Sequence, residues 1–270
     1  MKFKYLMLSF CIITIILLIA ALIPILLTGQ EFAVNFRFMI LPLLLFIAVL
    51  LVCICVFFFL NYRLFSLLER EDWPALAYYL EQKVYVKKRY NTRNVRLLAS
   101  SYLVMSDHKS VLTLESKVRS AKSSLISENV LIFGAARILS GSHAEAADFF
   151  KTYITKCKEA EKQWVSWFYG FSQLLAGAIN AAESEFASLA VSSNNALITG
   201  LCAYFLGTNI GKKSVNPEKC MEISENGKER VVKVLKNAEG WKKEVNKSET
   251  DIHVAIIKKY IDEAGIWLFV

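Results

Sequence analysis

The residue types that could support catalysis are few and scattered in this chain of 270 residues. The three histidines are His108, His143 and His253, and the first two fall in predicted turns between helices. His143 and Glu145 match the H-x-E fragment of zinc deaminases, but the sequence lacks the P-C-x-x-C segment that completes such a metal site. We therefore expect structural roles for the histidines, and neither a metal nor another cofactor.

A glycine- and lysine-rich segment, residues 207–214, has some features of a phosphate-binding P-loop. A P-loop needs four residues between its glycines, but only three separate Gly207 from Gly211, and two lysines precede Ser214. The six cysteines form no C-x-x-C pair and have no histidine at metal-ligand spacing. The sequence therefore predicts a linker at 207–214, buried hydrophobic cysteines and a protein that is not an enzyme.

The composition indicates a membrane protein. Apolar residues make up 55% of the chain, and 32 Lys and Arg against 24 Asp and Glu give a formal charge of +8. No charged residue lies between Lys4 and Glu31, or between Arg37 and Arg63. Residues 6–27 and 38–62 are each long enough, as helices, to cross a hydrocarbon core of about 30 Å. Residues 1–62 are thus predicted to form a hairpin of two transmembrane helices.

The orientation of this hairpin is inferred from its basic residues. The connecting loop has only Arg37, whereas the flanks carry Lys2 and Lys4 before the first run, and Arg63 and Arg70 after the second. The positive-inside bias then places both termini in the cytoplasm. A cleaved signal peptide is the weaker alternative, because the first run is too long and no A-x-A site follows it.

A basic tract follows the second predicted span. We expect its charged side chains to contact anionic lipid headgroups, at about 1 kcal/mol for each basic residue near the surface. A solvated helix end with no such partner is an equal alternative. Nucleic-acid binding is not expected, because charges of both signs are mixed along the remaining helices. The predicted headgroup contacts are Lys83, Lys87, Lys88, Arg89 and Arg93.

After residue 62 the sequence predicts one helix after another and no strand. Two helix pairs share a spacing: Ala146 and Phe150 follow Gly134 by twelve and sixteen residues, and Ala182 and Phe186 follow Gly170 by the same intervals. Small residues at these positions indicate that the two helices of a pair approach closely. The aromatic residue is expected to fill the groove to the next pair.

On these residues the chain resembles the tetratricopeptide (TPR) repeat family, with Ala99 and Tyr102 at the first positions of a weaker preceding repeat. The repeat spacing is 36 residues rather than 34, and the weaker repeat has Val111 and Glu115 in place of the small and aromatic residues. Two spans followed by helical repeats also resemble the architecture of HemY-like proteins. The expected fold is all-α: a membrane hairpin (1–62), a TPR-like α-solenoid (63–206), and a linker with C-terminal capping helices (207–270), the last opened by a capping box at Ser248.

The resemblance to TPR proteins implies a concave face, formed by the first helix of each pair, that holds a partner. On this register the candidate partner-binding residues are Arg96, Tyr102, Arg137, Gln173 and Tyr204. An unusually aromatic helix around Trp167 is expected to expose at least one ring. The predicted function is a membrane-anchored scaffold for assembling a bacterial membrane complex. The alternatives are a component of a spirochaete-type flagellar motor assembly and a membrane-bound enzyme without a recognisable motif.

Overall fold

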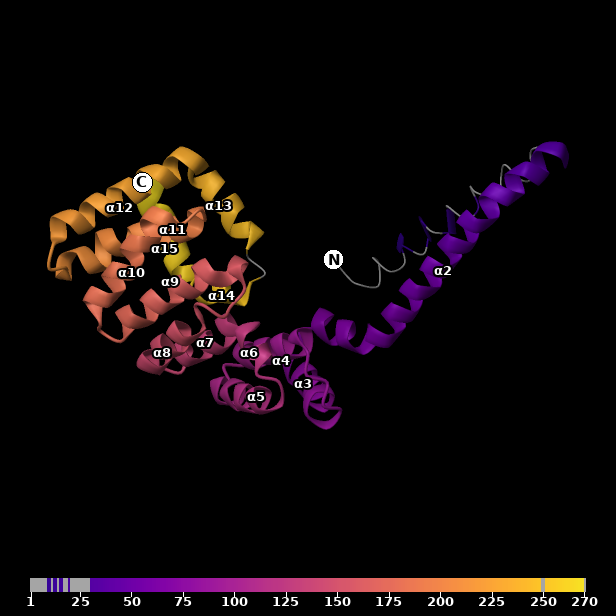
Figure 1. Cartoon of the computed structure of the whole chain (residues 1–270), viewed down its shortest axis with the longest axis horizontal. Coiled ribbons are helices and arrows are strands. Elements are labelled where there is room, and N and C mark those ends of the chain that lie inside the picture. The colour runs from indigo at the N-terminus through magenta and orange to yellow at the C-terminus, as the bar shows by residue number, and fades with distance from the viewer. Residues whose placement is uncertain are drawn as a thin grey trace. The chain divides into compact units, whose positions relative to one another are not determined.

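The computed structural model describes residues 30–248 and 251–269, together with positions 9, 10, 12, 13, 15, 16 and 19 (Figure 1). The chain divides into two compact units, Met1–Tyr79 and Leu80–Val270. Every regular element in the described parts is helical, which confirms the all-α prediction for them.

The N-terminal unit is dominated by α2 (Gln30–Glu69), a helix of 40 residues that continues through Pro42. Among the described residues, one segment is long and apolar enough to cross a membrane: Leu45–Glu69, within α2. Large apolar side chains such as Phe46 and Phe59 are exposed along it. The predicted second span, 38–62, thus lies in α2, whereas the predicted first span, 6–27, lies largely outside the described residues.

A tight turn ends α2 and starts α3 (Trp73–Glu81). Glu71 adopts a positive φ of 54°, and the carboxylate of Asp72 accepts a hydrogen bond from the backbone N–H of Ala75 at 3.1 Å. This satisfies one of the free N–H groups in the first turn of α3. Asp72 is therefore the residue that caps the start of α3.

The C-terminal unit contains the remaining helices. They are the π-helical turn η1 (Gln82–Val86), α4 (Thr92–Val104), α5 (His108–Ala121), α6 (Ser124–Ser127), α7 (Val130–Leu139), α8 (His143–Tyr153), α9 (Glu159–Leu175), α10 (Ile179–Ser192), α11 (Ala196–Phe205), the short turns η2 (Leu206–Ile210) and η3 (Gly211–Lys213), α12 (Pro217–Leu235), α13 (Ala238–Lys247), α14 (Ile252–Ile256) and α15 (Lys258–Phe269). From α7 to α12, each α-helix packs against the next along the chain.

Two of the helix pairs are built on the same internal contact. In α7–α8 a Cβ atom on Gly134 would overlap the Phe150 ring, and in α9–α10 a Cβ on Gly170 would lie 3.0 Å from the ring of Phe186. The close approach predicted from the glycines is therefore confirmed.

Each aromatic ring of these contacts also stacks on a ring of the next helix along the chain. Phe150 stacks on Phe168 of α9 at a centroid distance of 5.7 Å, and Phe186 stacks on Phe205 of α11 at 5.6 Å. The aromatic residue of the second helix thus bridges successive pairs, as the sequence predicted.

The turns inside these pairs are also alike. Gly141 and Gly177, 36 residues apart, adopt φ values of 80° and 81°, a left-handed conformation that glycine adopts without steric cost. In the turn between α4 and α5, Ser106 takes the place of the glycine and has a φ of 58°. The first pair therefore keeps the backbone of the turn but not its residue type.

The pair α4–α5 differs inside as well. Ala99 and Val111 are fully buried, and Glu115, at the position of the phenylalanines, is only 3% exposed. Its carboxylate lies 2.6 Å from the guanidinium of Arg119 and 2.6 Å from that of Arg137 on α7. A buried ion-paired cluster therefore replaces the aromatic stack between this pair and the next.

The C-terminal segment departs from the sequence prediction in its helix boundaries. The side chain of Asn237 accepts a hydrogen bond from the backbone N–H of Gly240 at 2.9 Å and starts α13, a helix that the sequence analysis did not identify. Ser248 is at the C-cap of α13, and Asp251 is at the N-cap of α14. The predicted capping box at Ser248 is therefore wrong, because Ser248 ends α13 instead of starting the next helix.

The end of the chain lies along the first helices of the pairs. Helix α14 packs on α7, and α15 packs on α11, α12 and α13 (Figure 1). The Tyr260 ring lies 5.3 Å from the rings of both Phe171 and Phe205. In α15, Ile261 and Ala264 are fully buried. This segment is therefore part of the hydrophobic core of the unit.

The position of the C-terminal segment explains the aromatic helix α9. Trp164, Trp167, Phe168 and Phe171 are all buried, and Tyr169 is half-buried. The expectation of an exposed ring assumed that α9 buries only one stripe. The C-terminal segment instead covers a second side of α9, so rings that point in different directions are both buried.

Candidate functional site

The histidines and cysteines form no reactive centre in the described residues. No group of three or more His, Cys, Asp or Glu side chains there could hold a metal ion. His108 and His143 are the first residues of α5 and α8, so they lie directly after the turns in which the sequence placed them. Burial raises the pKa of the Cys202 thiol well above its usual range, which disfavours the nucleophilic thiolate.

The five predicted partner-binding residues do not share one surface. Tyr102 is 5% exposed and donates a hydrogen bond to Glu81 at 2.5 Å, and burial raises its pKa. Arg137 lies over the Phe149 ring of its own pair at 4.2 Å and pairs with Glu115 on α5. Arg137 therefore faces the second helices α5 and α8, and Tyr102 faces the end of α3, rather than an open groove.

The other three predicted residues lie further apart. Gln173 is half-buried on α9, and the hydroxyl of Tyr204 on α11 donates to Glu263 of α15 at 3.0 Å. Arg96 on α4 is exposed and lines a pocket. Of the five, only Arg96 lines this pocket.

The basic tract lies at the start of the C-terminal unit. Lys83 is half-buried in η1, whereas Lys87, Lys88, Arg89 and Arg93 are exposed. The loop is held in place by the side chain of Asn94, which donates to the backbone carbonyl of Arg89 at 3.1 Å. The lipid contact of these side chains stays a prediction.

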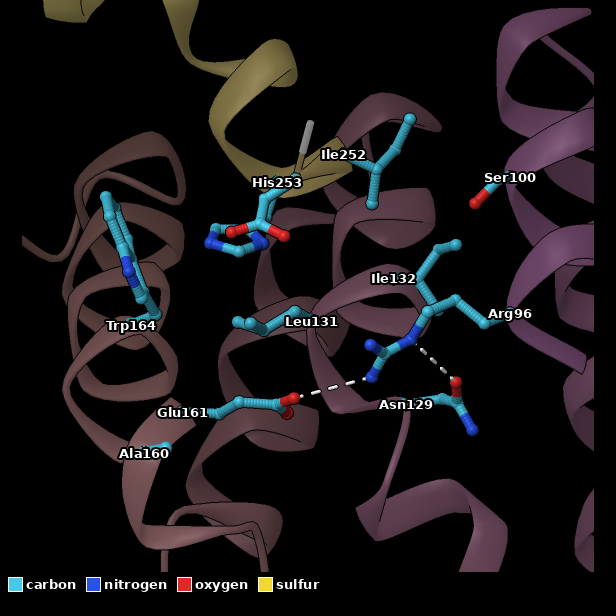
Figure 2. A pocket seen from close by; sticks show the side chains of 11 residues that line it. Arg96, Ser100, Asn129, Leu131, Ile132, Ala160, Glu161, Trp164, Ile252 and His253 are labelled. Carbon is cyan, nitrogen blue, oxygen red and sulfur yellow. Dashed lines mark hydrogen bonds and ion pairs between the residues drawn. The ribbon is translucent and has the colours of Figure 1, made fainter. Parts of the chain in front are cut away.

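The pocket lined by Arg96, which we call the helix-A pocket, has a volume of about 260 Å³. Its walls come from the first helices of three successive pairs and from the C-terminal segment (Figure 2). The lining residues are Arg96 and Ser100 of α4; Asn129, Leu131 and Ile132 at the start of α7; Ala160, Glu161 and Trp164 of α9; and Asp251, Ile252 and His253 at the start of α14.

Hydrogen bonds hold Arg96 across the floor of the helix-A pocket. Its Nη2 donates to the backbone carbonyl of Glu128 at 2.9 Å and lies 3.4 Å from the Glu161 carboxylate, and its Nε lies 3.4 Å from Asn129 Oδ1. Asn129 is 1% exposed and is fixed by donating to the carbonyl of Leu125 at 2.8 Å. The polar floor thus joins α4, α7 and α9.

His253 closes the opposite side of the helix-A pocket. It is 8% exposed, and its ring meets that of Trp164 edge to face at a centroid distance of 5.0 Å. Burial lowers the pKa of His253 to about 4; the Asp251 carboxylate acts in the opposite direction, and Arg96 adds to the lowering. His253 is therefore neutral at pH 7. Its buried Nε2 has no hydrogen-bond partner among the described residues.

Sequence reasoning placed Arg96 in a groove but missed Asn129, Glu161, Trp164 and His253. The last of these is at least 89 residues from each of the others in the chain. No periodicity connects α14 to α4, α7 and α9. Only the position of the C-terminal segment brings these side chains together.

The comparisons with known proteins identify a family. Residues 110–270, more than half of the chain, match the model of a family described as an uncharacterised Treponema protein. The chain belongs to this family. The matched region begins in α5 and runs to the end of the chain, so it includes both regular pairs and most of the helix-A pocket, but not Arg96 and Ser100.

A relative from Treponema pallidum (strain Nichols), described as an uncharacterized protein, is 26% identical over 216 residues. This alignment covers 77% of the present chain and 69% of the relative. No solved structure matches the chain. Neither match names a TPR or HemY-like protein, so those resemblances stay interpretations of the sequence.

Proposed function

We propose that this Treponema family member is a membrane-anchored adaptor that binds a partner protein at the bacterial inner membrane. In this proposal residues 1–62 form a two-span hairpin, both termini are cytoplasmic, and the basic tract around Lys88 contacts lipid headgroups. The C-terminal unit is a TPR-like solenoid. The apolar helix segment Leu45–Glu69 supports the anchor, and the repeated contacts of Gly134 and Gly170 support the solenoid.

The observation that carries the adaptor function is the helix-A pocket. TPR-like proteins resemble one another in using the face formed by the first helices of the pairs to hold a partner. Here the α9–α11 end of that face is filled by α15, and the pocket is the opening between α4, α7 and α9. A partner would therefore enter this pocket rather than a long groove.

An enzyme is the second candidate, and its support is weaker. The helix-A pocket contains a neutral histidine and two carboxylates, which are groups that can transfer protons. Among the described residues it offers no nucleophile paired with a base, because Ser100 is the only hydroxyl in its lining and the buried Nε2 of His253 has no hydrogen-bond partner. A flagellar-motor assembly is one setting in which the adaptor could act.

Photo-crosslinking in intact cells tests the proposal. A photoreactive amino acid is placed at Ser100, which is half-buried at the pocket, and separately at Val191, which is 67% exposed on α10. We expect a discrete protein adduct from position 100 and none from position 191, as judged by gel shift and mass spectrometry. Equal labelling at both positions, or no adduct at position 100, would contradict the adaptor function.

A further inference from the structure

The charges in the helix-A pocket differ in sign from those of the whole chain. The chain carries a formal charge of +8, but the pocket has two carboxylates, Glu161 and Asp251, against the single guanidinium of Arg96. Because His253 is neutral at pH 7, the pocket lining has a net charge of about −1. Its local field therefore favours a cation.

The hydrogen bonds of the helix-A pocket engage the guanidinium of Arg96 and one oxygen of Glu161, and they leave the Asp251 carboxylate available. Arg96 already faces a carbonyl, an amide oxygen and the Glu161 carboxylate. Asp251 is exposed, makes no capping hydrogen bond in α14, and forms no ion pair within the part of the chain that the structure describes. An incoming carboxylate would meet two like charges and a guanidinium that is already engaged, whereas an incoming cation would meet Asp251 directly.

A second, independent feature points to a ligand. His253 is more than nine-tenths buried, and its unpartnered Nε2 belongs to a ring that lines the helix-A pocket (Figure 2). A buried polar atom without a partner costs free energy, and a donor group in the pocket would remove that cost. Trp164 forms the adjoining wall, and an indole attracts a cation within about 6 Å of its ring.

The size of the helix-A pocket limits what can enter it. Its volume of about 260 Å³ lies below the range of about 300–1,000 Å³ that is usual for small-molecule sites. One extended side chain fits this size, and a helix does not. The chemistry required is a cationic head that donates hydrogen bonds on a narrow apolar stem.

We infer that the helix-A pocket receives a Lys or Arg side chain from the partner protein. The cation lies between the Asp251 and Glu161 carboxylates, its N–H groups reach His253 Nε2, and its stem packs along Trp164 and Leu131. This inference rests on the proposed adaptor function and specifies the partner by charge: the docking segment is basic.

The test measures binding of an amino-acid probe to the purified full chain in detergent micelles, by saturation-transfer difference NMR. The probe is N-acetyl-arginine amide, and its matched control is the citrulline analogue, which has nearly the same shape and no charge. We expect the arginine probe to bind at least about tenfold more tightly than the citrulline probe. Equal binding of the two probes, or tighter binding of N-acetyl-glutamate amide, would overturn the inference.

Two variants locate the site. Asp251→Asn and Glu161→Gln should each weaken arginine-probe binding by about tenfold, whereas Asp262→Asn, which removes an exposed carboxylate of α15 outside the pocket, should leave it unchanged. Unchanged binding in both pocket variants would reject the site. Because this assay needs no partner, it separates the two hypotheses: a crosslink at position 100 without charge-selective probe binding keeps the adaptor and rejects the basic ligand.

Discussion

The two ends of the face formed by the first helices differ in what covers them. Over α9 and α11, Tyr260 and Ile261 of α15 fill the surface with apolar contacts. Over α4 and the start of α7, next to α14, the surface retains a pocket that is lined by Arg96 and Asn129. One end therefore contributes to the hydrophobic core, and the other presents hydrogen-bonding groups to whatever enters the pocket.

The same contrast exists between the helix pairs. Phe150 and Phe186 join successive pairs in the regular part by aromatic stacking, and Glu115 with Arg137 joins α5 to α7. Aromatic burial stabilises the fold mainly through the apolar area that it removes from water, whereas a buried ion pair must offset the desolvation of its charges through its geometry. The comparison indicates that the α4–α7 end is stabilised by a few specific interactions and is the more sensitive to their loss.

The largest effect is expected at the buried ion pair. Glu115→Ala should lower the free energy of unfolding by about 3–5 kcal/mol, because Arg137 keeps a mostly buried charge without its partner. Combining Glu115→Leu with Arg137→Met should recover most of this loss. The measurement is urea denaturation of the detergent-solubilised chain.

A surface pair provides the control for the ion-pair prediction. Glu159→Ala removes the partner of Lys162 in an exposed ion pair, so the free energy of unfolding should hardly change. If Glu115→Ala lowered the free energy of unfolding as little as Glu159→Ala, the α4–α7 end would not depend on its buried ion pair.

The next effect concerns pH at the helix-A pocket. The pKa of His253 is about 4 in the folded chain against 6.5 for an ordinary histidine, so the unfolded chain binds more protons between these values. The contribution of His253 to the free energy of unfolding is therefore fully present above about pH 6.5. It is lost as the pH falls to about 4, and the loss amounts to at most about 3 kcal/mol.

Comparison with His253→Asn isolates this contribution, because Asp251, Glu161 and Arg96 remain in the variant. The difference in unfolding free energy between wild type and variant, measured from pH 7 to pH 4, should narrow as the pH falls. A difference that is independent of pH would mean that His253 is not buried as a neutral side chain.

The smallest effect is expected when the two closely packed glycines are each replaced by alanine. Gly134→Ala places a methyl group against the Phe150 ring and should destabilise the fold by about 1–3 kcal/mol. Gly170→Ala meets the Phe186 ring at 3.0 Å, and the better helix propensity of alanine offsets much of the strain, so a change within about 1 kcal/mol is expected. Equal losses in thermal unfolding would show that the two pairs are packed alike.

The sequence by itself determined the features that depend on neighbouring residues. The helix start at Asp72 and the glycine turns follow from local hydrogen bonding and backbone sterics. The contacts of Gly134 and Gly170 follow from a spacing repeated within one pair. These features were predictable because the partners are at most sixteen residues apart in the chain.

Only the tertiary structure decided how the face of the first helices is used. The sequence placed the last helix at the end of the solenoid, and the structure places α14 on α7 and α15 on α11. Apolar stripes on these helices, such as Ile257 and Ile261, show that they must be buried but not against which helix, because burial of apolar area has no direction. The helix-A pocket depends on that choice, since His253 reaches Trp164 and the neighbourhood of Arg96 only through the path of the C-terminal segment.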